Sequence, residues 1–275
     1  MPIVAAALMP HGSEAIPELN APNFAKFRRV SEGLDAAAEW LSRYPARTAV
    51  VLTPHGLRAD NMITVSISET VRGILESDSQ RVDDTFPVNR ALAQHIAAAT
   101  VAHDLPTASI AYGASSGPFS QLPLDWGAQV PLHFLSQHVP DLATVVMTPS
   151  RAWPLATLYR LGEVLWETLE EWSEPVWLIA SADMAHAHDA QGPYGFHPAA
   201  AAFDAWFQDV VERQDWAALT SVDMDWVQDA KPDALWQMVI LAGALNHRFQ
   251  PRLLGYDCPT YFGMMNAAFI PDTLP

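Results

Sequence analysis

The chain has 275 residues, half of them hydrophobic and 17% charged, which is the composition of a globular protein with a sizeable core. Its formal net charge of −16 argues against nucleic-acid or anionic-membrane partners, because both require clustered lysine and arginine, although the acidity could equally serve solubility alone. The single cysteine excludes an intramolecular disulfide, and no apolar stretch approaches the roughly 18–20 residues that span a bilayer. With no charged leader at the N-terminus, we expect a cytoplasmic protein.

Predicted strands and helices alternate along the chain. Continuous apolar runs predict strands at 3–9, 48–53, 62–68, 107–112, 143–148 and 176–181. Helical periodicity predicts helices at 22–43, 88–103, 154–172, 198–213 and about 232–246, followed by closing strands at 252–256 and 261–269. This order indicates a single α/β domain over residues 1–275, with a central mixed sheet flanked by helices, because some strands follow one another without a helix.

Two of the predicted strands end in the same tripeptide, Pro-His-Gly. His11 follows "AALMP" and His55 follows "VVLTP". In each copy proline ends the strand ladder and glycine permits a sharp turn. Ligands of such sheets bind beyond the carboxyl ends of strands, and neutral imidazole is a common ligand of iron, zinc and copper. The pair therefore indicates either a shared metal site or two structural histidines.

A third polar cluster follows the strand at 176–181, in the segment "SADMAHAHDAQGPYGFHP". Its side chains include Asp183, His186, His188 and Tyr194. Histidine titrates near neutrality, so such a cluster suits proton transfer. The alternative is a polar surface loop in which these residues serve as caps.

The segment "LPLDWGAQVPLHFL", residues 122–135, places Asp125 and Trp126 ahead of an apolar stretch. By itself it predicts a loop that enters a buried segment. Within it His133 is expected to be a core histidine with a satisfied hydrogen bond. Cys258, near the closing strands, is expected to be a buried thiol that packs as a small hydrophobe.

Taken in order, these segments resemble the class III extradiol ring-cleavage dioxygenases. This is the superfamily of the protocatechuate 4,5-dioxygenase catalytic subunit, and it includes Memo-like proteins. The two Pro-His-Gly segments match strand ends of that family. "LDWGAQVPLHFL" resembles its Asp-His-Gly…Val-Pro-Leu stretch, and "SADMAHAHDAQGPYGF" resembles its Gly-Asp-Leu-Ser-His…Pro-Tyr-Gly stretch. "LWQMVILAGAL" (235–245) resembles the helix that carries its third metal ligand, so the likeness covers most of the chain.

The resemblance implies an Fe(II)-dependent enzyme that cleaves a catechol, aminophenol or related aromatic ring with O2. It assigns His11 and His55 as metal ligands and His186 as the acid/base, with Zn(II) as a possible replacement metal. The substrate contacts that it suggests are Asp125, Trp126, His188 and Tyr194. The expected partners are a small aromatic substrate and O2, in a homo-oligomer or in a pair with a second subunit.

Two positions depart from the family pattern. Trp126 stands where the dioxygenases carry a histidine that contacts substrate and oxygen. The third-ligand glutamate aligns with Ala234, and the neighbouring carboxylate is Asp233, although one step along a helix rotates a side chain by about 100°. Asp233 is thus the candidate third ligand, at the start of its helix. The departures leave open a Memo-like metal-binding or regulatory protein, or a non-catalytic subunit, that has lost ring cleavage.

Overall fold

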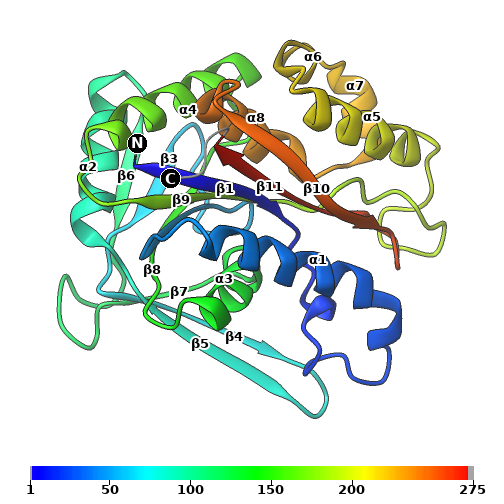
Figure 1. Cartoon of the computed structure of the whole chain (residues 1–275), viewed down its shortest axis with the longest axis horizontal. Helices are drawn as coiled ribbons and strands as arrows, with labels where there is room; N and C mark the ends of the chain where they lie inside the picture. Colours follow the sequence, from blue (N-terminus) through cyan, green and yellow to red (C-terminus); the bar gives the residue numbers. More distant parts are fainter. Residues whose placement is uncertain (1, 272–275) are drawn as a thin grey trace.

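The computed structural model describes residues 2–271 and is built around an eight-stranded mixed sheet (Figure 1). The strand order across this sheet is β10-β11-β1-β9-β2-β8-β3-β6. The strands are β1 (Ile3–Met9), β2 (Thr48–Leu52), β3 (Ile63–Ser66), β6 (Thr107–Ile110), β8 (Ala143–Thr148), β9 (Val176–Ser181), β10 (Phe249–Asp257) and β11 (Met264–Pro271). The α/β fold with a central mixed sheet is therefore confirmed.

The four central strands, β1, β9, β2 and β8, run parallel to one another. Ala7 pairs with Ile179, Ile179 with Val51, and Val51 with Val146. All four side chains are buried, which explains why these strands read as continuous apolar runs. The sheet is mixed because β11 is antiparallel to β1 and β3 is antiparallel to β8.

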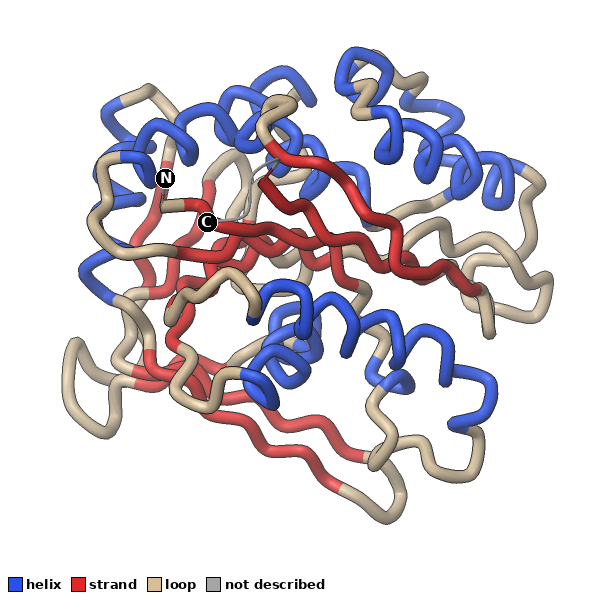
Figure 2. Tube along the Cα trace, viewed as in Figure 1, coloured by secondary structure: helices blue, strands red, loops and turns tan. Residues whose placement is uncertain are grey.

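Helices cover both faces of the sheet (Figures 1 and 2). One face carries α1 (Phe24–Ser42) and α3 (Trp126–His138), and the other carries α2 (Arg90–Ala102), α4 (Leu155–Glu170) and α8 (Ala234–Leu245). Helices α4 and α8 touch backbone to backbone, since a Cβ atom on Gly162 would lie 2.0 Å from the carbonyl oxygen of Ile240. Among residues 2–271, no helix combines the length and apolar character needed to cross a bilayer.

Most of the remaining helices and strands were not predicted. Helices α5 (Ala199–Arg213), α6 (Trp216–Thr220) and α7 (Met224–Ala230) pack together beside α8; α5 was expected, but the short α6 and α7 were not. A second sheet, in the order β5-β4-β7, consists of β4 (Thr70–Glu76), β5 (Arg81–Pro87) and β7 (Gln121–Pro123). Its strands are partly exposed and rich in polar residues, so they carry no continuous apolar signal.

The segment 122–135 was expected to be a loop that enters a buried stretch; its apolar part is buried as expected, but it forms a helix, which was not predicted. Helix α3 begins directly after Asp125, whose carboxylate accepts a hydrogen bond from the backbone N–H of Ala128 at 3.1 Å. Pro131 lies inside this helix, and proline usually signals a helix end, so the pattern concealed the helix. The helix tolerates it because most of its residues are buried against neighbouring elements.

Candidate metal centre

Parallel pairing brings the ends of three strands to one edge of the sheet. Strand β9 lies between β1 and β2, so the residues that follow all three strands emerge side by side. His11 follows β1, His55 follows β2, and Asp183 follows β9. The two strands carrying Pro-His-Gly are thus separated by one strand, yet their imidazole rings meet edge to face with centroids 4.8 Å apart.

Three donor atoms face one another at this edge. The Nε2 atoms of His11 and His55 lie 3.0 Å apart, and Oδ2 of Asp233 lies 3.3 Å from the former and 3.1 Å from the latter. Adjacent donors held about 2.1 Å from one metal ion are about 3.0 Å apart in an octahedral site and about 3.4 Å apart in a tetrahedral site. The spacing and the donor types therefore fit a single transition-metal ion bound by two histidines and a carboxylate.

Asp233 is the N-cap of α8, and the start of this helix lies beside the cluster. Its backbone N–H donates to the carbonyl of Asp183 at 3.2 Å. Arg151 forms an ion pair with Oδ1 of Asp233, which leaves Oδ2 toward the two histidines. The guanidinium of Arg151 also stacks over the ring of Trp236, 4.6 Å from its centroid. The carboxylate of Asp233 thus lies at the start of α8, where its Oδ2 faces His11 and His55.

The charges of the cluster follow from burial and from these pairings. Burial raises the pKa of Asp183, and the nearby His11 offsets this only in part. Burial also acts to raise the pKa of Asp233, but its hydrogen bonds with His11 and His55 and the charge of Arg151 bring that pKa far below its ordinary value. Burial lowers the pKa of His11, yet the two carboxylates outweigh burial and raise it. Asp233 is therefore a carboxylate ready to act as a ligand.

His186 lies beside this cluster with one ring nitrogen occupied. Its Nδ1 lies 3.1 Å from the carbonyl oxygen of Lys231, a residue held at φ 55° in the left-handed region. A carbonyl only accepts, so Nδ1 carries the hydrogen and Nε2 is left as a free base. The ring stacks on Phe262 with centroids 5.2 Å apart. Burial lowers the pKa of His186, partly opposed by Asp183 and Asp233, so its imidazole is neutral at pH 7.

The cluster opens into a cavity of about 580 Å³. Trp126 forms one wall, with its ring stacked on His55 at a centroid distance of 4.3 Å. Tyr194 meets His186 edge to face at 5.6 Å. The residues that line the cavity are His55, Arg58, Trp126, Arg151, His186, Tyr194, Met224, Val227, Gln228, Lys231, Pro232, Asp233 and Trp236.

Two of the expected substrate contacts lie outside this lining. Asp125 caps α3, and its Oδ1 also accepts a hydrogen bond from the hydroxyl of Thr53 at 2.5 Å, which ties the start of α3 to the His55 loop. The Nε2 atom of His188 lies 2.8 Å from Oδ2 of Asp204, which also accepts a hydrogen bond from the Tyr256 hydroxyl at 2.7 Å. Asp125 and His188 thus have local structural partners, and their contact with a substrate stays a prediction.

The two residues expected to be structural have local polar partners. His133 is half-buried, with Nδ1 3.3 Å from the carboxylate of Asp84, but its buried Nε2 has no partner among the described residues, so the expected core histidine is satisfied at one nitrogen only. The thiol of Cys258 lies 3.5 Å from the carbonyl of Thr260 and is partly exposed rather than buried. Neither residue lines the cavity.

Sequence reasoning missed Arg151 and Ser181. Strand β8 ends in "VVMTPSR", which parallels the "VVLTPHG" at the end of β2, its parallel neighbour. This third strand end, with threonine and proline in the same places, was the available signal for Arg151. Ser181 is the last residue of β9 and ends an apolar run, and its single hydroxyl gave no comparable signal.

The fold and the cluster define an α/β protein with a His-His-carboxylate site at the carboxyl edge of its parallel strands. The chain belongs to the family described as the catalytic LigB subunit of aromatic ring-opening dioxygenase, whose model matches residues 5–269. The resemblance stated from the sequence is thereby confirmed at the level of the family.

The chain is also similar to two individual proteins. It is 24% identical over 252 residues to Protein CA_C1420 of Clostridium acetobutylicum, an alignment that covers 91% of this chain and 54% of that protein. The chain thus spans about half the length of this curated relative. The crystal structure of uncharacterized protein JW3007 from Escherichia coli K12 superposes with a TM-score of 0.63 at 15% identity, covering 96% of this chain and 99% of the other. At this identity the likeness shows a shared fold.

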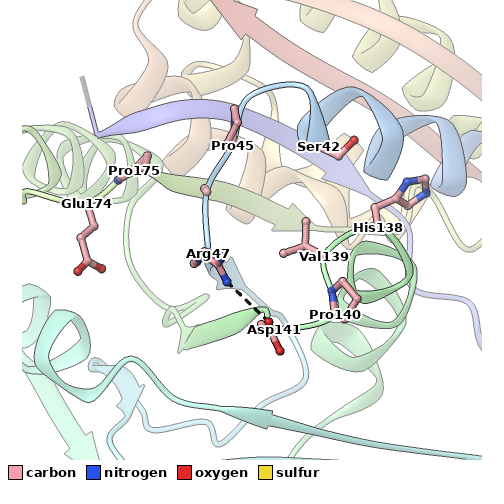
Figure 3. A pocket seen from close by; sticks show the side chains of 10 residues that line it. Ser42, Pro45, Arg47, His138, Val139, Pro140, Asp141, Glu174 and Pro175 are labelled. Atoms are coloured by element: carbon pink, nitrogen blue, oxygen red, sulfur yellow. Dashed lines mark ion pairs between the residues drawn. The ribbon is translucent and has the colours of Figure 1, made fainter.

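A second hollow, of about 550 Å³, lies at the opposite edge of the sheet (Figure 3). Its walls come from the segments that precede β2, β8 and β9, so it faces away from the metal centre. Its one ion pair joins Arg47 and Asp141 at 3.7 Å, with both side chains largely exposed. Such a pair contributes little, and the hollow brings together no donor cluster of the kind found around His11.

Proposed function

We propose that this protein is a non-haem Fe(II)-dependent extradiol dioxygenase that opens the ring of a catechol, aminophenol or related aromatic compound. The observation that carries the proposal is the set of three donor atoms 3.0–3.3 Å apart, with the free nitrogen of a neutral His186 beside the same cavity. Membership of a ring-opening dioxygenase family supports it. We further propose that residues 1–275 act as one catalytic domain, in the cytoplasm.

In this proposal His11, His55 and Asp233 hold the metal by one face. Fe(II), when bound, would bring the substrate and O2 together and mediate the transfer of electrons to O2 from the aromatic ring, which is the reductant. His186 accepts the proton of a substrate hydroxyl through its unprotonated nitrogen. The side chains of Trp126, Tyr194 and Trp236 line the cavity, where they pack on the aromatic ring of the substrate and exclude water from it.

The cavity also favours a ring with an anionic substituent. Arg58 and Lys231 both line it, and among residues 2–271 neither forms an ion pair, although most arginines of this acidic protein do. Arg151, the third cation of the lining, is already engaged by Asp233. Two unpaired cations in one cavity are suited to a carboxylate on the substrate.

Oxygen uptake by iron-loaded protein tests the function. Protein purified without oxygen and reconstituted with Fe(II) is expected to consume O2 with at least one member of a panel of catechols and aminophenols, and to form a coloured ring-opened product. Asp233→Asn should abolish uptake, whereas Asp209→Asn, which removes an exposed carboxylate paired with Arg213, should leave it unchanged. Iron-loaded wild-type protein without uptake on the whole panel would contradict the proposal.

Trp126 favours a second candidate. In place of the family histidine it leaves the cavity one proton-transfer group short, as expected of a Memo-like metal-binding or regulatory protein or of a non-catalytic subunit. That candidate predicts metal binding without turnover. A non-catalytic subunit further predicts an active homologue that co-purifies in fixed ratio.

A further inference from the structure

Pro131 changes the hydrogen bonding of helix α3 at the point where this helix meets the metal centre. In an α-helix the N–H of residue 131 would donate to the carbonyl of residue 127. Proline has no N–H, so this bond is absent and the carbonyl of Gly127 lacks its helical partner. The same carbonyl instead accepts a hydrogen bond from the hydroxyl of Ser181.

Ser181 has only one hydroxyl hydrogen, and the Gly127 carbonyl uses it. The Oγ atom of Ser181 also lies 2.9 Å from Nδ1 of His11, with both residues fully buried. A hydroxyl that donates elsewhere can only accept here, so Nδ1 of His11 is the donor. In the neutral imidazole that metal binding requires, this leaves Nε2 unprotonated, and Nε2 is the atom that faces His55, Asp233 and Asp183.

We propose that Pro131 is a positioning residue of the metal centre, acting through Gly127 and Ser181 to hold His11 in the tautomer that presents Nε2 to the metal. This inference rests on the metal site of the proposed function but not on ring cleavage. It concerns a proline whose position inside a helix has no other evident benefit, since a proline there costs roughly 3 kcal/mol relative to alanine in a helix interior.

The start of α3 packs tightly against the site, so a change in its hydrogen bonding can reach His11. A Cβ atom on Gly127 would lie 2.5 Å from Oγ1 of Thr53, 2.8 Å from Oδ1 of Asp125 and 3.2 Å from Cδ2 of His55. Only glycine fits between these atoms. The carbonyl of Gly127 is consequently fixed in relation to the His55 loop, and it stays in place as the acceptor for the Ser181 hydroxyl.

Pro131→Ala tests the proposal because it removes no group from the site. The restored N–H competes for the Gly127 carbonyl and frees the Ser181 hydroxyl to donate to His11, which would place the hydrogen of His11 on Nε2. We expect the Kd for Zn(II) and Co(II), measured by chelator competition, to rise about 10–100-fold, while the melting temperature of the metal-free protein stays equal or rises. Ser136→Ala, which removes a hydroxyl elsewhere on α3, is the matched control and should leave the Kd unchanged.

Ser181→Ala and the double variant complete a cycle. Ser181→Ala alone should raise the Kd to a similar extent, and adding Pro131→Ala to it should then have no further effect, because the relay is already broken. An unchanged Kd in Pro131→Ala, or additive effects in the double variant, would overturn the proposal. These readouts need no substrate, so a wild-type protein that binds metal without consuming O2 would refute the dioxygenase function alone.

Discussion

Arg151 and Asp233 form the ion pair that orients the carboxylate of the candidate metal centre. Arg151 takes Oδ1, and Oδ2 then lies 3.1 Å from Nε2 of His55. Stacking of the guanidinium on Trp236 keeps Arg151 in place. The pair thus turns the other oxygen of Asp233 toward the two histidines of the proposed site.

Arg151→Met should therefore weaken metal binding even though Arg151 is not itself a ligand. Without its partner the carboxylate is free to rotate and to bind through both oxygens, and we expect the Kd for Zn(II) to rise roughly 10-fold or more. Arg160→Met, which breaks only exposed ion pairs, is the control. Equal metal affinity in both variants would show that Asp233 is oriented without Arg151.

Trp126 should contribute to substrate binding by stacking. Trp126→Ala is expected to raise KM for a catechol about 10-fold, which corresponds to the roughly 1.4 kcal/mol of a lost aromatic contact, with kcat affected less. Trp126→Phe keeps a ring on His55 and should retain most of the affinity. Steady-state oxygen uptake measures both, and a KM unchanged in the alanine variant would remove Trp126 from the substrate site.

His186→Gln should lower kcat by about 10²–10⁴ with little change in metal affinity, because the amide keeps the hydrogen bond to Lys231 but provides no base. The pH dependence carries a further expectation. Burial lowers the pKa of His186, so the unprotonated imidazole persists below the ordinary histidine pKa of about 6.5. The midpoint of the acid limb of the pH–rate profile should therefore lie below pH 6.5. An acid limb with its midpoint above pH 7 would show that a group other than His186 is the base.

The cations Arg58 and Lys231 should distinguish a carboxylate from its neutral amide. We expect 3,4-dihydroxyphenylacetate to bind more tightly than 3,4-dihydroxyphenylacetamide, and Arg58→Gln with Lys231→Gln to reduce that preference by 10-fold or more. Fluorescence titration of the zinc-loaded protein measures binding without turnover. Arg29→Gln, outside this cavity, is the control, and equal binding of acid and amide by the wild type would exclude the anionic subsite.

The pair of His188 and Asp204 should make the stability of the fold depend on pH, independently of the metal centre. Its hydrogen bond to buried Asp204 raises the pKa of His188 to about 10, so the charged pair stabilises the fold fully below about pH 6.5 and the contribution is lost as the pH rises through 10. His188→Gln should lower the free energy of unfolding by about 2 kcal/mol at pH 6, and the difference should vanish near pH 10 or above. Denaturant unfolding at several pH values tests this, and a constant difference would contradict it.

Much of the fold could be predicted from the sequence because its central strands are buried on both faces. Burial on both faces demands continuous apolar residues, and the strands at 143–148 and 176–181 have the predicted bounds. Helix α3 and the second sheet could not be predicted, since Pro131 masks the helix and polar residues mask the strands.

The sequence by itself determined that His11 and His55 leave two buried strands at equivalent points, because the same Pro-His-Gly turn ends each strand. Only the tertiary structure decided what completes the cluster. Asp233 lies 178 positions beyond His55 in the chain, and its carboxylate reaches the site through the cap geometry of α8 and the charge of Arg151. Neither of these is a property of local sequence, because both depend on how distant segments pack around one edge of the sheet.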